Sequence, residues 1–323
     1  MNRPLAAPLH LPAWLVGLRR FVFLLWLGLA PSPATARTDP PGSSIVRFGF
    51  SRSMFLDLNE NDARAAVKVY ATLLGTANQL IVDGSPGIFD NPTRIAEAFA
   101  EGTADVVAMP TQEYLAIPPG LASARLIAAK FAGSITEDYL LLVRDDSGIT
   151  KLAELQGRRL LLSSGLRGSL AASWLDVLLA KAGLDPPARF FSNVGSANKP
   201  IRTVLPVFFR QEDACIVTRQ GYQIMGELNP QVMKQMRVLA TSPGFVPTVT
   251  IFRASLPPDL LKRIIKATIE AQDTVAGQQM LTIFQSGNVT EIEPEKLDSV
   301  RTLLADHARL CEKAKPKKSK SSR

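Results

Sequence analysis

Hydroxyl groups, glycines and one arginine are concentrated in a short segment that separates an apolar run from an apolar, helix-forming stretch. The segment reads Ser163-Ser164-Gly165-Leu166-Arg167-Gly168-Ser169. The first turn of a helix offers backbone N–H groups without an internal partner, at the positive end of the helix dipole. Hydroxyls and an arginine beside such a turn form a binding site for an anion. The alternative is structural: Ser163 or Ser164 caps the helix, and Gly168 relieves a turn.

The scarcity of histidine and cysteine restricts the catalytic chemistry that is open to this chain. His10 lies in the apolar N-terminal leader, which leaves His307, in a polar C-terminal segment, for any Ser-His-Asp mechanism. One histidine and two distant cysteines do not make a zinc site of the usual kind. We therefore expect no catalytic residues, no metal and no cofactor, and a protein that is not an enzyme. Cys215 and Cys311 could pair in an oxidising compartment, although the apolar run around Cys215 favours a buried free thiol.

The N-terminus has the pattern of a cleavable export signal. Arg3, Arg19 and Arg20 precede an apolar core, and the small residues at positions 34–36 fit a cleavage site. The core is much shorter than the roughly 20 residues that a membrane-spanning helix needs. We predict a signal peptide over residues 1–36 and a periplasmic mature protein, with the general secretory and the twin-arginine routes both left open.

Positive charge is concentrated at the two ends of the chain. The formal net charge of +8 includes three arginines of the leader, and six basic residues against one acidic residue in the C-terminal segment 312–323. The chain between these ends is therefore close to neutral, which argues against the basic groove or helix of a nucleic-acid-binding protein. We expect residues 312–323 to form a disordered, solvated tail.

Strand-like and helix-like segments alternate along the rest of the chain, which is typical of an α/β protein. Its length suits two lobes, and we predict that each lobe is a mainly parallel sheet flanked by helices. The expected strands cover residues 45–50, 79–82, 104–109, 126–130, 138–144, 160–162, 213–218 and 237–240. Helices are expected over residues 59–75, 91–102, 150–155, 170–179, 201–210, 257–275, 277–286 and 294–310. Trp174 falls on the apolar face of its helix, so we expect it in the core.

Four stretches, in their order along the chain, resemble the phosphate- and phosphonate-type substrate-binding proteins of ABC transporters. They are Phe48-Gly49-Phe50-Ser51, residues 104–107 with Glu113-Tyr114-Leu115, residues 152–162, and residues 207–215. The resemblance extends over nearly all of the chain after the leader. It depends on the order of the whole set, since each piece alone is common in α/β proteins.

The resemblance implies a two-lobed periplasmic binding protein fold of type 2, with lobe one formed by residues 45–134 and 245–311 and lobe two by residues 135–244. Two hinge crossovers would join the lobes, and the ligand would bind in the cleft between them. It also implies a monomer that captures a small oxyanion, such as phosphate or a phosphonate, and delivers it to the permease of an ABC transporter in the inner membrane. A ligand sensor that docks on a membrane signalling protein, and an enzyme of the same fold, remain as alternatives.

By position, the resemblance assigns ligand contacts to three groups of residues. They are Ser51, Arg52 and Ser53 after the first strand, Thr111 and Tyr114 after the third, and Ser163, Ser164, Arg167, Gly168, Ser169 and Asp213 in lobe two. Some have simpler explanations, since Arg52 could pair with Asp57 on the surface and Asp213 could begin a turn. The family tends to show a Ser-Thr-Ser-Gly loop where this chain has Ser163-Ser164-Gly165, which leaves the identity of the anion open.

Overall fold

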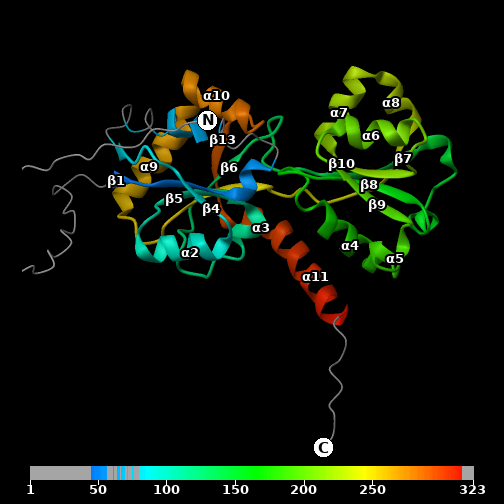
Figure 1. Ribbon diagram of the computed structural model, residues 1–323, viewed down its shortest axis with the longest axis horizontal. Coiled ribbons are helices and arrows are strands. Elements are labelled where there is room, and N and C mark those ends of the chain that lie inside the picture. Colours follow the sequence, from blue (N-terminus) through cyan, green and yellow to red (C-terminus); the bar gives the residue numbers. More distant parts are fainter. Residues whose placement is uncertain are drawn as a thin grey trace, which may run out of the picture. The chain divides into compact units, whose positions relative to one another are not determined.

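The computed structural model describes residues 45–56, 61, 64, 65, 67–69, 71, 75 and 80–314. The predicted leader, most of the basic tail and much of the helix expected over residues 59–75 lie outside them. Within the described part, two β-sheets each carry helices on both faces (Figure 1), which confirms the predicted two-lobed α/β class. None of the helices formed by these residues has the length and apolar composition needed to cross a bilayer.

Lobe one is built on a six-stranded sheet with the strand order β13-β6-β12-β5-β2-β4. Its strands are β2 (Phe48–Ser51), β4 (Gly87–Phe89), β5 (Val106–Pro110), β6 (Leu126–Ala129), β12 (Thr248–Phe252) and β13 (Val289–Ile292). A separate parallel pair consists of β1 (Ile45–Val46) and β3 (Ile81–Val82). The shorter elements of this lobe are η1 (Arg52–Phe55), α3 (Thr111–Tyr114), η4 (Ala271–Asp273), α10 (Val275–Ile283) and η5 (Pro294–Leu297).

The alternation of side chains along β5 sends them to two helical layers. Val107 and Met109 pack in the layer of α2 (Pro92–Glu101), whereas Val106 packs in the layer of α9 (Pro258–Glu270).

The signals at both ends of α2 were readable in the sequence. It begins after an Asn91 cap and ends at Gly102, whose φ is 71°.

Lobe two is built on a five-stranded sheet with the strand order β11-β7-β10-β8-β9. Its strands are β7 (Tyr139–Arg144), β8 (Arg159–Ser163), β9 (Asn193–Ala197), β10 (Ala214–Thr218) and β11 (Met236–Thr241). One face is covered by α6 (Pro200–Phe208), α7 (Arg219–Leu228) and α8 (Pro230–Gln235), and the other by α4 (Ala171–Lys181) and α5 (Pro187–Phe190), as Figure 1 shows. Two short helices, η2 (Asp145–Ser147) and η3 (Leu152–Leu155), lie between β7 and β8.

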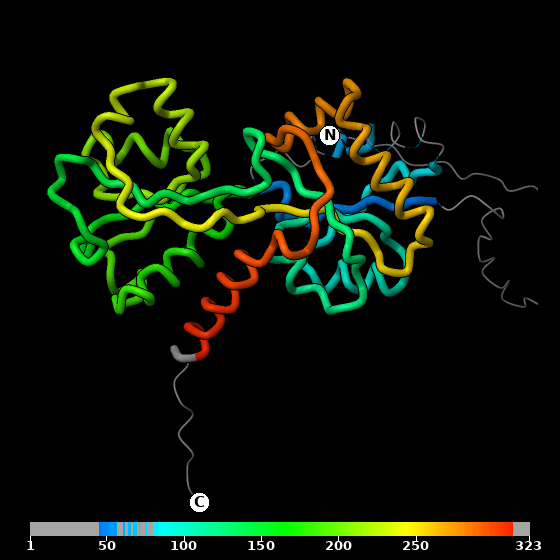
Figure 2. Tube along the Cα trace, turned by 180° about the vertical axis from the view of Figure 1, so that it is seen from behind, coloured from blue at the N-terminus to red at the C-terminus, as the bar shows by residue number. Residues whose placement is uncertain are grey.

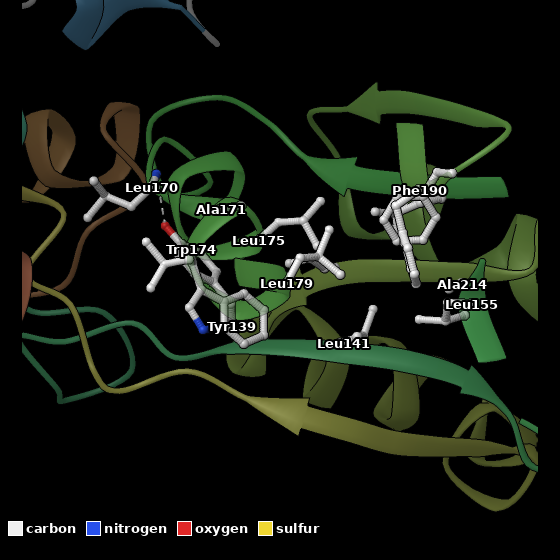
Figure 3. Close-up of a cluster of buried hydrophobic side chains, with 14 of the residues drawn as sticks. Tyr139, Leu141, Leu155, Leu170, Ala171, Trp174, Leu175, Leu179, Phe190 and Ala214 are labelled. Atoms are coloured by element: carbon white, nitrogen blue, oxygen red, sulfur yellow. Dashed lines mark hydrogen bonds between the residues drawn. The ribbon is translucent and has the colours of Figure 1, made fainter. Parts of the chain in front are cut away.

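Trp174 is buried between α4 and the lobe-two sheet, as predicted (Figure 3). Tyr139 of β7 and Ala214 of β10 belong to the same core layer, together with Leu175 of α4. Complete burial of a large apolar side chain contributes about 1.5–3 kcal/mol relative to exposure. Cys215 lies in the opposite layer, where it is a buried free thiol, and burial raises its pKa.

The two sheets are mixed, which corrects the prediction that each would be mainly parallel. Strands β2, β4 and β5 run parallel to one another, as do β8, β9 and β10. Strands β7 and β12, by contrast, run antiparallel to the neighbours with which they pair. Each of these two strands enters its sheet from the other lobe and not through a crossover helix, so no βαβ connection requires it to run parallel.

Two chain segments connect the sheets and lie side by side (Figure 2). They are residues 130–138, which follow β6, and residues 242–247, which precede β12. The Glu137 amide donates to the Phe245 carbonyl at 2.8 Å, and the Phe245 amide donates to the Glu137 carbonyl at 3.0 Å. The Tyr139 amide donates to the Ser242 hydroxyl at 2.8 Å. We call these paired segments the hinge, because they are the two crossovers that the resemblance implied.

The C-terminal helix α11 (Asp298–Ala314) packs on lobe two, whereas the resemblance implied that residues up to 311 belong to lobe one. Val300 and Leu303 enter the lobe-two core beside α4. His307 forms a 2.9 Å hydrogen bond with Asp176 of α4. The apolar face of α11 is visible in the sequence, but which lobe it covers depends on contacts with α4, more than 100 residues earlier.

Candidate functional site

Three parallel strands of lobe two end at the same edge of the sheet, and each leads to a helix. β8 is followed by the loop 164–170 and α4, β9 by α6, and β10 directly by α7. A cavity of about 440 Å³ opens at this edge. The polar part of its lining consists of Ser163, Ser164, Arg167, Asn198, Lys199, Thr218 and Gln285. Open α/β sheets generally bind ligands at the carboxyl ends of their strands.

The helix N-termini at this edge make the cavity favourable for negative charge. α6 begins after Lys199, whose side chain makes no capping bond, and α7 begins after Thr218, whose hydroxyl accepts the Gly221 amide at 3.1 Å. In the described part of the chain, no hydrogen bond uses the amides of Gly168 and Ser169, just ahead of α4. The described lining also contains no carboxylate. Open amides, dipole ends and an ammonium group together favour an anion.

The loop between β8 and α4 folds back closely on the end of β8. The Ser164 amide donates to the Ala197 carbonyl of β9 at 2.9 Å. A Cβ atom at Gly168 would lie 2.5 Å from the Ser163 carbonyl oxygen, so only glycine fits there. Because α4 begins at Ala171 without a side-chain cap, neither serine is its capping residue. The loop therefore leaves both serines at the cavity.

Arg167 is held by the hinge at one side of the cavity. Its guanidinium donates to Glu137 and Gln220 and lies 4.9 Å from the ring centre of Phe131. Glu137 is 3% exposed; burial raises the pKa of its carboxyl, although the Arg167 charge opposes the shift. The Arg167 Nε atom is buried and has no partner in the described chain. Arg167 thus links the loop to the crossover segment 130–138 and keeps one donor open.

The Tyr139 hydroxyl ties the same loop to β7, the first strand after the hinge. It accepts the Leu170 amide at 3.3 Å, the bond drawn in Figure 3, and donates to the Arg167 carbonyl at 2.8 Å. Burial raises the pKa of Tyr139, so the hydroxyl stays protonated and able to donate. The shape of the loop therefore depends on the position of β7.

Lobe one contributes apolar groups to the cavity. Met54 of η1 and the side chains of Ile283 and Phe284, at the end of α10, line it. Leu166, from the lobe-two loop, is buried in a cluster with Phe50 and Met54 of lobe one. The loop between β8 and α4 therefore contacts both lobes.

Of the lobe-two residues assigned from the sequence, Ser163, Ser164 and Arg167 line the cavity. Gly168 and Ser169 lie next to them in the loop but are not part of the lining. The Ser169 Oγ atom is buried, and within the described residues it has no hydrogen-bond partner. The structure thus brings together most, but not all, of the predicted loop residues.

The residues assigned in lobe one do not line this cavity. Ser51 is buried and donates to Glu113 at 2.5 Å, and Arg52 pairs with Asp90 at 2.7 Å. Asp57, the alternative partner of Arg52, lies outside the described residues. The carboxylates of Glu113 and Asp90 thus already engage the hydroxyl of Ser51 and the guanidinium of Arg52, respectively.

The other lobe-one candidates lie near the same edge of their sheet. The Ser53 amide donates to the Ser51 hydroxyl at 3.3 Å, and Tyr114 packs against the lobe-one core. Thr111 is fully buried, and its Oγ1 atom has no partner among the described residues. These residues follow the carboxyl ends of β2 and β5, which pair in parallel.

Asp213 lies at the opposite edge of the lobe-two sheet, which corrects its assignment to the cleft. It precedes β10, and its carboxylate accepts the amide of Arg159, the first residue of β8, at 2.9 Å. The cavity lies at the other end of these strands, where Ser163 and Thr218 are found. Asp213 connects the starts of two strands.

The sequence did not reveal four polar residues of the lining: Asn198, Lys199, Thr218 and Gln285. The first two follow β9, whose sequence of Asn, Val, Gly, Ser and Ala has no apolar run that would indicate a strand. Thr218 could have been predicted as a site residue, because it is the last residue of a strand that was expected over residues 213–218.

Residues 57–297 match a protein family described as ABC transporter, phosphonate, periplasmic substrate-binding protein. The matched segment covers well over half of the chain and includes both sheets almost completely. No curated protein sequence matches this chain.

Solved structures share the fold at low sequence identity. XAC2383 from Xanthomonas citri, bound to ATP, has a TM-score of 0.59 at 16% identity, over 84% of this chain and 100% of that one. PhnD1 from Prochlorococcus marinus, in complex with methylphosphonate, has a TM-score of 0.53 at 14% identity, over 83% and 98% of the two chains. A binding protein component of an ABC phosphonate transporter from Pseudomonas aeruginosa has a TM-score of 0.52 at 14% identity, over 83% and 87%. At these identities the likeness concerns the fold alone.

Proposed function

The chain belongs to the periplasmic substrate-binding proteins of ABC phosphonate transporters, and on that premise we propose that its lobe-two cavity holds the anion. One observation carries the proposal: hydroxyls, an ammonium group and helix N-termini gather at the cavity, and no carboxylate lies among its described lining residues. Ser163, Ser164, Thr218 and Lys199 supply these side-chain donors. Such groups meet the oxygens of a tetrahedral oxyanion with charge-assisted hydrogen bonds.

Capture and release would depend on the hinge. The loop that contributes Ser163 and Ser164 to the cavity is bonded to the hinge through Arg167 and to β7 through Tyr139. We propose two moving lobes, one formed by residues 45–134 with 245–297 and the other by residues 135–244. An anion that orders this loop would favour one position of these two lobes relative to each other. Domain closure around a ligand works in this way.

Titration of the mature protein tests the binding site. Methylphosphonate, inorganic phosphate and ATP are suitable ligands, because each presents tetrahedral oxyanions of a different size. We expect at least one to bind at a single site, and Ser164→Ala to weaken it about ten-fold or more, since a hydrogen bond to a charged group contributes roughly 1.5–3 kcal/mol. The matched control Ser53→Ala, outside the cavity, should leave affinity unchanged. Equal effects of both substitutions, or no oxyanion binding at all, would contradict the proposal.

The transport role extends the proposal to a partner and a compartment. We propose that the mature chain, after removal of residues 1–36, works as a monomer in the periplasm and delivers its anion to an ABC permease in the inner membrane. Deletion of the protein should abolish uptake of the ligand found by titration, and the wild-type chain should restore it. A sensor that docks on a signalling protein would leave uptake intact and alter a transcriptional response instead.

A further inference from the structure

Glu137 is a buried carboxylate that is connected to the cavity through Arg167. It lies in the hinge, is 3% exposed and accepts a hydrogen bond from the Arg167 guanidinium. Arg167 is 21% exposed and belongs to the lining of the cavity, whereas Glu137 does not. When Glu137 is ionised, the two side chains together carry no net charge. The arginine that faces the anion is then already neutralised by a carboxylate outside the lining.

The other ionisable groups around Glu137 do not replace Arg167 as its partner. The segment 242–247, which pairs with the Glu137 backbone, contains no ionisable residue, and α7 contributes the uncharged amide of Gln220. The remaining groups are Asp138 beside it in the chain, Arg219 of α7, which binds Asp138 at 2.9 Å, and Tyr139, whose hydroxyl stays protonated because burial raises its pKa. Within the described chain, Arg167 is the cation that pairs with Glu137.

An anion at Arg167 changes the balance that keeps Glu137 ionised. Burial raises the pKa of Glu137, and the positive charge of Arg167 opposes that rise. A bound anion brings a second negative charge to the same guanidinium, and like charges that share one site disfavour ionisation. The pKa of Glu137 therefore rises further when the anion binds. Protonation of Glu137 removes one of the two competing charges and leaves the guanidinium to the ligand.

We propose that anion binding in this cavity is coupled to the uptake of a proton by Glu137. The inference rests on the proposed function, because it needs an anion in the cavity that Arg167 lines. The proton comes from solvent and ends on a carboxylate oxygen of Glu137, and no covalent bond of the ligand changes. Linkage is reciprocal, so the anion binds more tightly at a pH at which Glu137 is protonated.

Calorimetric titration of the mature protein, in two buffers of different ionisation enthalpy, measures the number of protons taken up on binding. The probes are those of methylphosphonate, inorganic phosphate and ATP that bind. We expect the wild type to take up more protons than Glu137→Gln, by up to about one, between the pKa of Glu137 in the free protein and its higher pKa in the complex. Protonation of the ligand itself cancels in this difference.

The matched control is Asp138→Asn. It removes the neighbouring carboxylate of the same segment, which is bound to Arg219 and not to Arg167. This variant should take up as many protons as the wild type. A loss of proton uptake in Asp138→Asn that equals the loss in Glu137→Gln would overturn the assignment to Glu137.

The affinities give a second readout, which a merely structural role of Glu137 would not produce. From about pH 8 to about pH 5, the affinity of the wild type should rise about five-fold or more relative to that of Glu137→Gln. At about pH 8, Glu137→Gln should bind the anion more tightly than the wild type, because Arg167 is no longer neutralised. A structural role alone predicts weaker binding by the variant at every pH.

The outcomes separate this inference from the proposed function. Equal proton numbers and parallel pH profiles in the wild type and Glu137→Gln would overturn the inference and leave the proposed function intact. A failure of all three anions to bind would overturn both. If Glu137→Gln does not fold, the infrared difference spectrum of the free and anion-bound wild type, with isotope-labelled glutamate, decides. The carbonyl band of a protonated glutamic acid should appear on binding, and its absence would overturn the inference.

Discussion

The carboxyl ends of the parallel strands carry different chemistry in the two lobes. In lobe two, Lys199 and Ser164 line a cavity whose described lining contains no carboxylate. In lobe one, two of the corresponding polar groups have partners within the lobe, because Ser51 donates to Glu113 and Arg52 pairs with Asp90. The Thr111 hydroxyl is buried without a partner among the described residues.

On the proposed function, the two lobes divide the work of recognition. Lobe two would meet the charge of the ligand with its donors, and lobe one lines the cavity with the apolar side chains of Met54 and Phe284. A carboxylate in the lining of the cavity would repel an anion. Glu113 and Asp90 are paired with Ser51 and Arg52 and are not part of that lining. The sequence of lobe one resembles an anion site, but the Ser51 hydroxyl and the Arg52 guanidinium are already engaged.

The largest expected effect comes from breaking the link between lobe two and the hinge. Arg167→Met leaves Glu137 buried without its cationic partner, and loss of one partner of a buried pair costs about 3–5 kcal/mol. We expect a comparable fall in the free energy of unfolding, measured by urea denaturation. Arg52→Met, in the exposed pair with Asp90, should cost less than about 1 kcal/mol.

A double variant sharpens that result. Arg167→Met with Glu137→Met removes both charges, and it should recover part of the stability lost in Arg167→Met, because no buried charge is left unpaired. Additive losses in the double variant would show that the pair is not coupled.

The next effect concerns the charge that lobe two presents to the ligand. Lys199→Gln should weaken oxyanion binding about five- to ten-fold, and the loss should shrink as salt screens the attraction. Arg52→Gln in lobe one should change affinity by less than about two-fold. Titrations at low and high ionic strength measure both, and a larger loss in Arg52→Gln would reverse the assignment of the two lobes.

A smaller effect is a dependence of stability on pH through Glu137. Its folded-state pKa is raised, mainly by burial, so the folded protein binds this proton more tightly than the unfolded chain does. The stabilisation is complete below the unfolded pKa of about 4.3 and is lost as the pH rises through the folded value. Glu137→Gln should lack this component when unfolding is measured from pH 4 to pH 7. An unchanged pH profile would contradict the assignment.

The smallest effect is expected at Asp213. Asp213→Asn keeps an oxygen that can accept the Arg159 amide, so affinity should stay within about two-fold of wild type and stability should change little. A ten-fold loss of oxyanion affinity would place this residue at the cavity after all.

Local signals in the sequence account for much of this architecture. The Asn91 and Gly102 ends of α2, the apolar face with Trp174 and the hydroxyl-rich loop after β8 are all encoded by neighbouring residues. Such features follow from capping, periodicity and turn chemistry, which act over a few residues.

The features that the sequence did not predict depend on contacts between distant residues. The Arg167 partner Glu137 lies 30 positions away, so an arginine that looked free for an anion is shared with the hinge. Asp213 precedes its strand, and only the parallel pairing of β10 with β8 shows that it sits far from the strand ends at the cavity. The polar sequence of β9 concealed the strand that positions Lys199.

A crystal structure of the mature protein with bound methylphosphonate tests the division of work between the lobes most directly. We predict that the phosphorus atom lies at the ends of β8 and β10, with its oxygens within hydrogen-bond distance of Ser164 and Lys199. Phosphonate oxygens bonded to Ser51, Arg52 or Thr111, with the lobe-two cavity filled by water, would contradict it.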